Sequence, residues 1–464
     1  MTDGILSKRR RCVAYHQCAA TIFMVSLSGC AVAPKEMALG PERRQLNVAA
    51  FDEVWTTIRD THWDPNLGGL DWEALRDQYR PRVESAEYMS EARRAIGDLI
   101  AELKQTHFSV IPAELLDDEE TAEGAGQRDG GTGIDVRVVD EQALVVSVDE
   151  GSPAEKLGIK PGWIIVRVDD RLVGPRLAKI RDSLADDSTI GDMRMARAVT
   201  SRLYGQVGET VEVEFLDAED RGHTHNIKLT PRRGKKVQLG LLPPFYLSFE
   251  SRRIGAGIGY IAFDGFMDPL RIMGGYSEAI TDFMDADGLI IDLRGNPGGI
   301  GAMAMGMAGW LIAQESQYLG TMKTRTTELK FVVNPRATTF RGPVVVLVDG
   351  LTGSTAEIFS GGLKDLGRAT IVGSRTAGAA LPAQLKKLPN GDGLLYAVAN
   401  YVSEGGGVLE GKGVIPHIEA PLTREALLAG RDPALEEAIA VINGQRGLDP
   451  DTKEFRQVTG AEKR

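Results

Sequence analysis

The second half of the chain alternates short apolar runs with stretches of helical pattern. The runs are rich in β-branched residues, as is typical of strands buried on both faces. The strands expected from them are residues 258–263, 288–293, 344–348 and 370–372. Helical spacing covers residues 277–284, and a further strand is expected over residues 394–402. Strands that alternate with helices predict a mostly parallel sheet, and this multidomain α/β chain has its main unit at residues 240–430.

The pattern near the N-terminus is helical. Phe51, Val54, Trp55 and Ile58 recur at the spacing of one helix face, and residues 88–103 repeat that spacing. Because two amphipathic helices close in sequence bury their apolar faces together, we expect an N-terminal helical domain over residues 47–120.

The middle of the chain predicts a small β-domain. Its expected strands are residues 143–148, 163–168, 210–215 and 225–229. A Gly-Thr-Gly-Ile-Asp-Val segment (131–136) precedes them, and a short helix begins near Pro153. Residues 130–233 resemble a PDZ domain of the bacterial protease type. The resemblance implies that the backbone N–H groups of Gly131, Gly133 and Ile134 bind the terminal carboxylate of a peptide, which adds a strand to the sheet. A β-domain that only packs against its neighbours is the alternative.

Composition narrows the possible functions. The chain has 464 residues, 42% of them hydrophobic and 26% charged, as in folded proteins. Its net charge of −11 argues against a nucleic-acid partner. All three cysteines lie in the first thirty residues, so the body has no cysteine nucleophile or cysteine metal site. The chain has six histidines, which limits the candidates for a histidine base.

The first thirty residues have the pattern of an export signal. Four basic residues (8–11) precede an apolar run over residues 18–27, which is too short to span a bilayer as a helix. The run ends in Leu27-Ser28-Gly29-Cys30, which resembles the bacterial lipobox. The resemblance implies cleavage between Gly29 and Cys30 and lipidation of Cys30. It also implies a tether over residues 31–46 and a membrane-anchored protein of the cell envelope or periplasm. An ordinary signal cut near Gly29, or a fortuitous apolar patch, is the alternative.

Ser354 follows the expected strand 344–348 and begins an expected helix. Two functions fit a serine at this corner. Its hydroxyl can cap the helix by accepting a backbone N–H. It can also be a nucleophile beside free N–H groups of the helix N-terminus, which can bind an oxyanion. This local sequence does not decide between them.

Three ordered motifs favour the nucleophile. They are Asp-Leu-Arg-Gly-Asn-Pro-Gly-Gly (292–299), Gly-Ser-Thr-Ala-Glu (353–357) and Val-Gly-Ser-Arg-Thr-Ala-Gly (372–378). Together they resemble the C-terminal-processing and tricorn-core serine peptidases over roughly residues 47–430. The resemblance implies a crotonase-like spiral α/β catalytic domain with an inserted or preceding PDZ-like domain, and it implies that Ser354 is the nucleophile. Residues 431–464 are expected to form a C-terminal helix and a polar tail.

The general base follows from the branch of the family. One branch uses a lysine 25 residues beyond the nucleophile, but Ala379 occupies that position. The tricorn-like branch uses a histidine of the N-terminal domain, preceded by serine, and a late glutamate. Thr106-His107 matches the first, with threonine in place of serine, and Glu410 matches the second. A histidine can take the serine proton and return it to the leaving amine, and a carboxylate orients the ring.

The same resemblance implies two oxyanion donors, the N–H of Thr355 and a glycine N–H of the Gly298-Gly299 turn. Two other residues are candidates for a role near the site. His417 is a rival base and Asp365 a candidate structural carboxylate. Glu410 is alternatively a plain loop carboxylate.

The function expected is that of an exported, lipid-anchored serine endopeptidase that acts on polypeptides, with no cofactor and no metal. The alternatives are a binding protein that retains the fold without the chemistry, and an esterase on the same scaffold. The sequence leaves the substrate and the oligomeric state open.

Overall fold

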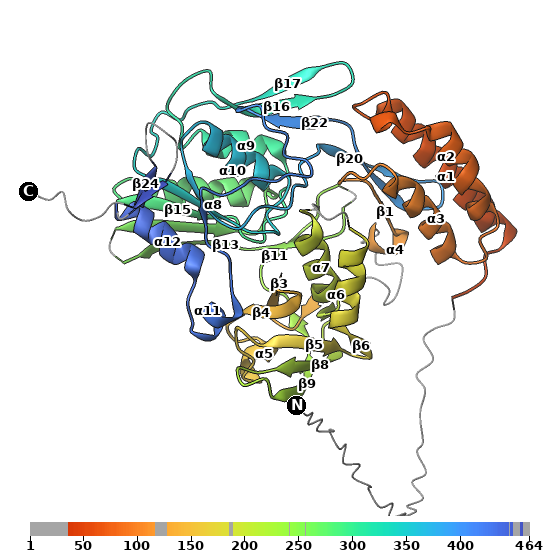
Figure 1. Cartoon of the computed structure of the whole chain (residues 1–464), viewed down its shortest axis with the longest axis horizontal. Coiled ribbons are helices and arrows are strands. Elements are labelled where there is room, and N and C mark those ends of the chain that lie inside the picture. The colour runs from red at the N-terminus through yellow and green to blue at the C-terminus, as the bar shows by residue number, and fades with distance from the viewer. Residues whose placement is uncertain are drawn as a thin grey trace, which may run out of the picture.

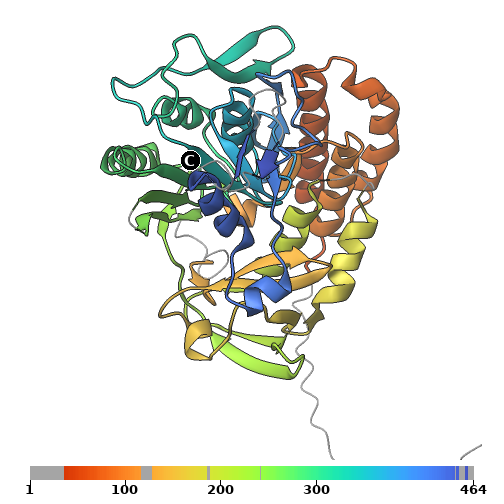
Figure 2. The same cartoon turned by 60° about the vertical axis from the view of Figure 1, so that its left-hand side comes forward.

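The computed structural model describes residues 36–116, 128–184, 189–240, 242–255, 257–444, 446–448 and 455–457. The expected leader with Cys30, residues 31–35 of the tether, residues 117–127 and most of the tail lie outside the described residues. Three units make up the described part: N-terminal helices, a middle β unit and a large α/β unit (Figures 1 and 2).

The N-terminal unit contains three main helices, α1 (Pro41–Thr61), α2 (Trp72–Glu84) and α3 (Met89–Ala101). Trp55 and Trp72 bind α1 to α2, since each indole N–H donates to the other residue's carbonyl. The sequence pattern missed α2, whose many charged side chains hide a narrow buried stripe. It also placed residues 41–46 in a tether, which is wrong because α1 begins at Pro41, where the missing N–H of proline costs nothing.

The middle unit is a twisted antiparallel sheet in the order β3-β4-β5-β8-β9, with β6 beside β5. Its elements are β3 (Ile134–Val139), β4 (Gln142–Val148), α5 (Pro153–Lys156), β5 (Ile164–Val168), β6 (Arg171–Leu172), α6 (Val173–Asp182), α7 (Gly191–Thr200), β8 (Thr210–Leu216) and β9 (Gly222–Lys228). A second small sheet joins β10 (Thr230–Pro231), β2 (Gly130–Gly131) and β7 (Tyr204–Gly205). Within the described residues, β3 pairs with β4 alone, and α7 packs against β3.

The large unit is built on a six-stranded sheet in the order β13-β14-β15-β18-β19-β23. The strands are β13 (Phe249–Ile254), β14 (Ile258–Phe263), β15 (Gly288–Asp292), β18 (Val344–Val348), β19 (Thr370–Gly373) and β23 (Ile418–Glu419). All neighbours are parallel except β13 with β14. This confirms the mostly parallel sheet, because β-branched runs bury well on both faces.

Helices cover both faces of this sheet. On one face, α8 (Pro269–Asp282), α9 (Gly301–Ala308) and α10 (Thr355–Asp365) contribute to the largest apolar core. On the other face, α12 (Pro433–Ile442) packs against Val345, Leu347 and Val372, and α11 (Arg424–Leu428) precedes it. The unit also has β11 (Lys235–Val237), which pairs with β12 (Phe245–Leu247), and β24 (Arg446–Leu448), which pairs with β25 (Phe455–Gln457).

The single strand expected over residues 394–402 is wrong. It is two strands, β21 (Gly393–Ala397) and β22 (Asn400–Ser403), which enter different sheets. β22 pairs with β16 (Tyr318–Lys323), whose other neighbour is β17 (Glu328–Val332). β21 lies between β20 (Ala383–Lys387) and β1 (Ser109–Ile111), close to the short helix α4 (Ala113–Leu116). A continuous apolar pattern does not reveal a change of partner strand.

The β1–β21 pairing attaches the N-terminal helices to the α/β unit. It aligns Ser109 with Leu395, and Leu388, Leu394 and Tyr396 join the apolar core of the N-terminal helices. The segment that carries His107 is therefore held against residues almost 300 positions later in the chain.

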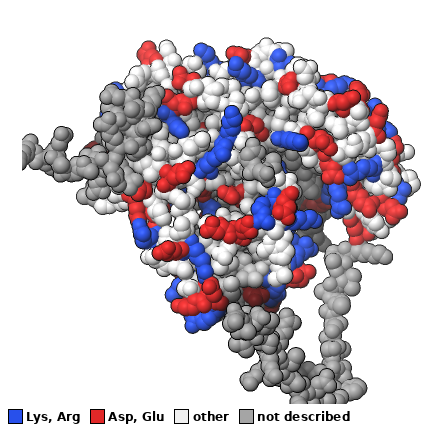
Figure 3. All heavy atoms as spheres, in the orientation of Figure 1, with Lys and Arg blue, Asp and Glu red and all other residues white. Residues whose placement is uncertain are grey.

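Acidic and basic side chains are interspersed over the face shown in Figure 3. In the described part of the chain, each helix is either too short or too polar to cross a bilayer.

Candidate active site

The site lies at the carboxyl edge of the parallel sheet. β15 and β18 are adjacent parallel strands, so the turns after them, residues 293–300 and 349–354, emerge side by side. Gly298 contacts the second turn so closely that a Cβ on it would lie 2.7 Å from the Cβ of Ser354. Glycine is required there because its φ is also +95°.

Ser354 stands at the corner between β18 and α10 in a strained backbone conformation. Its φ is 53° and its ψ is −120°, a region that residues other than glycine rarely adopt. Its N–H donates to the carbonyl of Ala379 (2.8 Å) and to Oε2 of Glu357 (3.0 Å). Its hydroxyl makes no capping hydrogen bond to α10. Strain of this kind persists where surrounding contacts impose it, and it is concentrated at functional sites.

Glu357 is a buried carboxyl group directly behind the serine. It accepts hydrogen bonds from Thr376 Oγ1 (2.5 Å) and from the N–H groups of Gly378 (2.8 Å), Ala379 (2.9 Å) and Ser354. Burial raises the pKa of Glu357 to about 7, against these four donors. Its role was not predicted from the sequence, although Ser-x-x-Glu spacing is the signal of a capping box.

Two backbone N–H groups near Ser354 have no hydrogen-bond partner among the described residues, those of Thr355 and Gly299. The N–H of Gly298 instead donates to Oδ1 of Asn296 (2.9 Å). The Asn296 amide in turn donates to the carbonyl of Phe263 (2.8 Å). The turn is thus fixed by Asn296, and the free donors beside the serine are those of Thr355 and Gly299.

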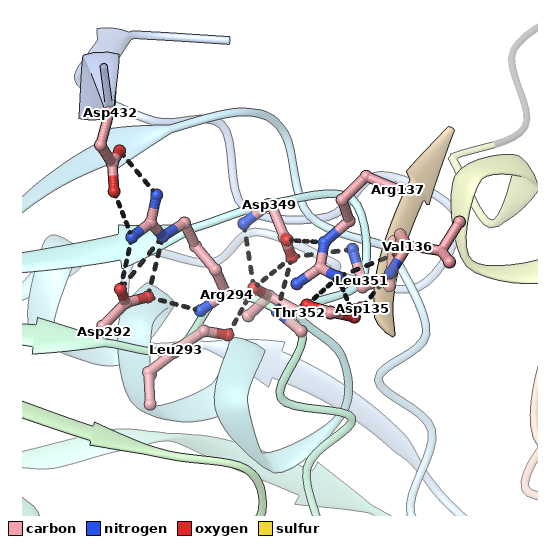
Figure 4. A network of polar contacts seen from close by, with 11 residues as sticks. Asp135, Val136, Arg137, Asp292, Leu293, Arg294, Asp349, Leu351, Thr352 and Asp432 are labelled. Carbon is pink, nitrogen blue, oxygen red and sulfur yellow. Dashed lines mark hydrogen bonds and ion pairs between the residues drawn. The ribbon is translucent and has the colours of Figure 1, made fainter. Parts of the chain in front are cut away.

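Asp349 fixes both turns at once (Figure 4). One oxygen accepts the N–H groups of Gly295 (2.9 Å) and Leu351 (3.0 Å), and the other accepts Nε of Arg137 (2.7 Å). Burial raises the pKa of Asp349, but the Arg137 charge and the Gly295 N–H outweigh it and hold that pKa below its usual value. Arg137 comes from β3, so this ion pair also attaches the middle unit to the turn before Ser354.

A second ion-pair network lies beside the first (Figure 4). Arg294 binds Asp292 (2.6 Å) at the end of β15 and Asp432 (2.8 Å) at the start of α12. Tyr260 also donates to Asp292 (2.8 Å). These contacts hold the first turn from the opposite side.

The Arg137–Asp349 pair predicts a large effect on stability. Both side chains are mostly buried, with 14% and 16% exposed. Asp349→Ala removes one of the two carboxylates that bind Arg137, which keeps Asp135, and leaves the N–H groups of Gly295 and Leu351 unpaired. We therefore expect the free energy of unfolding to fall by about 3 kcal/mol. Calorimetry should show a lower unfolding temperature. Arg167→Met, which breaks a more exposed pair with Glu214, is the control and should cost at most about 1 kcal/mol. Equal midpoints for the two variants would contradict this ranking.

The three predicted residues Thr106, His107 and Glu410 are brought together. Glu410 accepts the N–H of Thr106 at Oε1 (2.7 Å) and its hydroxyl at Oε2 (2.9 Å). The same hydroxyl lies 2.8 Å from Nδ1 of His107. The carboxylate therefore reaches the imidazole through the threonine hydroxyl. A serine at that position would offer the same hydroxyl, which is why threonine can replace it.

His107 is partly buried. Its φ of 58° is left-handed, another strained position. Burial, and secondly the charge of Arg197, lower the pKa of His107 to about 4, so the ring is neutral at pH 7. Burial also raises the pKa of Glu410, against the hydrogen bonds from Thr106 and Ala380.

One short segment, residues 379–380, contacts both Ser354 and the Glu410 carboxylate that holds Thr106 and His107. The carbonyl of Ala379 accepts the Ser354 N–H, and the next N–H, that of Ala380, donates to Glu410 (3.1 Å). Among the described contacts, no hydrogen bond joins Oγ of Ser354 to Nε2 of His107. Catalytic hydrogen bonds are often long in the absence of substrate and shorten when it binds.

The rival residues have other partners. Nδ1 of His417 accepts the N–H of Ile371 (3.0 Å), so this ring supports β19. Asp365 accepts the N–H of Gly405 (2.9 Å) at the far end of α10. Ala379, at the position of the family lysine, is almost fully buried. Groups of three or more metal-binding side chains do not occur among the described residues.

The predicted peptide-binding loop is closely packed. Gly131 pairs with Tyr204 and Thr230 in the small sheet, and the side chain of Ile134 is buried. The Ile134 N–H already donates to Thr132 Oγ1 (3.3 Å). Gly133 has φ +80°, and a Cβ on it would lie 2.2 Å from that of Ser152. The peptide-binding role of these three residues stays a prediction.

Two family models match the chain. The model of peptidase family S41 matches residues 257–420, and that of the tricorn protease C1 domain matches residues 44–101. The first therefore covers every strand of the large sheet except β13, together with both turns of the site. The second covers the helices that precede His107.

Relatives are similar over most of the chain. A carboxyl-terminal-processing protease of Synechocystis sp. is 26% identical over 415 residues, which are 89% of each chain. The carboxy-terminal processing protease CtpA of Bacillus subtilis is 25% identical over 77% of this chain and 69% of its own. Tricorn protease homolog 1 of Streptomyces coelicolor is 23% identical over 87% of this chain, but the match spans only 36% of that larger protein.

Solved structures share the fold. The crystal structure of mature CPAF superposes with a TM-score of 0.62 at 16% identity, covering 90% of this chain and 100% of that one. The photosystem II D1 C-terminal processing protease gives a TM-score of 0.54 at 22% identity, covering 85% and 97%. These likenesses show a common multidomain α/β architecture.

Proposed function

We propose that this chain is a serine-type peptidase of family S41, whose model matches residues 257–420, and that it cleaves polypeptides through an acyl-enzyme formed on Ser354. The observation that carries the proposal is the hydrogen-bonded series Glu410–Thr106–His107, anchored beside Ser354 by the segment 379–380. The two halves of this site come from positions some 250 residues apart in the chain.

We propose the following roles. Neutral His107 takes the proton of the Ser354 hydroxyl as it attacks the peptide carbonyl. The resulting imidazolium is stabilised by Glu410 through the Thr106 hydroxyl, and it then protonates the leaving amine. The N–H groups of Thr355 and Gly299 stabilise the oxyanion. Water releases the acyl group by the same steps in reverse order.

The finer assignments rest on the same resemblance. We propose that the α/β unit is a crotonase-like spiral domain and that the middle unit acts as a PDZ-like domain that captures substrate C-termini. Its support is that β3 has a free edge within the described residues and that α7 lies against it. A peptide can extend a sheet at such an edge.

A serine-directed fluorophosphonate tests the enzymatic proposal. We expect the purified protein to be labelled once, with the adduct mapped to Ser354, and Ser354→Ala to remain unlabelled. The rate of casein hydrolysis should fall in proportion to the labelled fraction of the protein. The unlabelled protein should cleave peptides in preference to small acyl esters. Silence toward the probe, with no casein cleavage, would instead indicate a binding protein on this scaffold.

We also propose that the protein is exported and anchored to a membrane by a lipid on Cys30. The support is the segment Leu27-Ser28-Gly29-Cys30 after an apolar run. Labelled palmitate should enter the wild-type chain in a bacterial host and not Cys30→Ser. Equal labelling of both chains would refute the anchor without affecting the peptidase proposal.

A further inference from the structure

One side of α7 borders the turn that carries Ser354. Ile190 and Met193 pack against Ala377 and Ala379. The Met193 methyl lies 3.0 Å from the place of a Cβ on Gly353. Just before the helix, Thr189 donates to the Ala377 carbonyl (2.8 Å). The helix thus brings residues of the middle unit to the site; both views show α7 below the junction of the other two units (Figures 1 and 2).

Arg197 lies one turn further along the same side of this helix. It follows Met193 by four residues, a spacing that places both side chains on adjacent parts of one face. Its side chain is exposed, and it has no hydrogen bond or ion pair within the described part of the chain. Partial desolvation lowers the pKa of Arg197, and the charge of Arg197 is the second cause that lowers the pKa of His107. The site therefore has an exposed guanidinium that no acidic side chain of the described residues pairs with.

The proposed role of His107 indicates which part of the substrate lies near Arg197. The base of an acyl transfer returns its proton to the leaving amine. That amine belongs to the first residue after the scissile bond. A cation beside His107 therefore faces the part of the substrate that follows the cut, whereas the N–H groups of Thr355 and Gly299 face the scissile carbonyl.

We propose that Arg197 is a specificity-determining residue that binds a substrate carboxylate within the first few residues after the scissile bond. The inference rests on the proposed peptidase function. Two sources supply that chemistry, an Asp or Glu side chain and the free C-terminal carboxylate of a chain cut near its end. A guanidinium can hold either one through two parallel hydrogen bonds. No acidic side chain of the protein competes for Arg197 among the described residues.

The experiment begins with casein and a mixed peptide library, whose cut sites mass spectrometry identifies. A peptide that the wild-type protein cleaves is then synthesised in matched forms, with Asp, Asn or Lys two residues after the cut, and with a free or amidated C-terminus close to it. We expect at least one of the carboxylate forms to be cleaved about tenfold faster in kcat/KM than its neutral partner. The Asp/Asn and acid/amide pairs tell the two sources apart.

Substitutions at Arg197 should change this ratio rather than the chemistry. Arg197→Met should bring the ratio to about one while the neutral peptides keep their rates within about twofold. Arg197→Glu should reverse the preference in favour of Lys. Arg194→Met, at an exposed arginine of the same helix, is the matched control and should keep the wild-type ratio.

Several results would overturn the inference while the peptidase stands. The first is equal cleavage of charged and neutral peptides by the wild-type protein, and the second is an unchanged ratio in Arg197→Met. The third is a loss of rate in Arg197→Met that is the same for all peptides, which would indicate a merely structural arginine. If the wild-type protein cleaves neither casein nor any peptide, the proposed function itself fails and the inference fails with it.

Discussion

Replacement of Ser354 by alanine is expected to lower kcat/KM on peptides by about 10⁴-fold or more. The variant removes the one atom that forms the acyl-enzyme in the proposed mechanism. It keeps the backbone contacts of residue 354, because those run through its N–H to Ala379 and Glu357. The Ser354 hydroxyl makes no capping bond to α10, so its loss should leave the unfolding temperature near that of the wild-type protein.

A second serine of the same helix provides the control. The Ser360 hydroxyl is buried and donates to the carbonyl of Ala356 (2.7 Å). Ser360→Ala should keep the activity and cost about 1 kcal/mol of stability, the usual value of such a hydrogen bond. Casein cleavage by Ser354→Ala at the wild-type rate would end the assignment of Ser354, and parallel losses in both variants would indicate damage to α10 rather than to the chemistry.

The parallel sheet was predictable because its signal is local. Residues 344–348 form β18 with the expected bounds, and the expected strand 258–263 is β14. A strand covered on both faces needs only a short run of β-branched apolar residues. The helix α2 was missed because its stripe of buried residues, Trp72, Tyr79 and Val83, is sparse among charged side chains.

The site could be predicted only as far as its motifs extend. Thr106, His107 and Glu410 were predicted by their resemblance to a known pattern, and their hydrogen bonds join positions 304 residues apart. Nothing local to Arg137 shows that it binds Asp349, since an arginine on a strand edge is usually solvated. Similarly, the position of Arg197 near the site is known only from the packing of α7 against the Ser354 turn. Contacts between units depend on tertiary structure, which a single sequence pattern does not encode.

Replacement of His107 by alanine is expected to lower kcat/KM by about 10⁴-fold, as loss of the serine does, because both residues act in one step of the proposed mechanism. Glu410 cannot replace the base directly, since its oxygens are occupied by Thr106 and Ala380. Thr106→Val should lower the rate by a smaller factor, since it removes the hydroxyl between Glu410 and the ring. Thr106→Ser keeps that hydroxyl and should retain most of the activity.

The titration of His107 gives this prediction an independent measurement. Because burial, and then Arg197, lower its pKa to about 4, the ring should stay neutral from pH 7 down to about pH 5. NMR of histidine-labelled protein can follow it, with the resonance assigned by its absence in His107→Ala. The depressed pKa also means that folding becomes less favourable as pH falls from 6.5 toward 4, since the unfolded chain takes up a proton that the folded ring does not. A ring that titrates at 6.5 or above would show that it is not enclosed beside Arg197, and full activity of His107→Ala would remove the histidine from the mechanism.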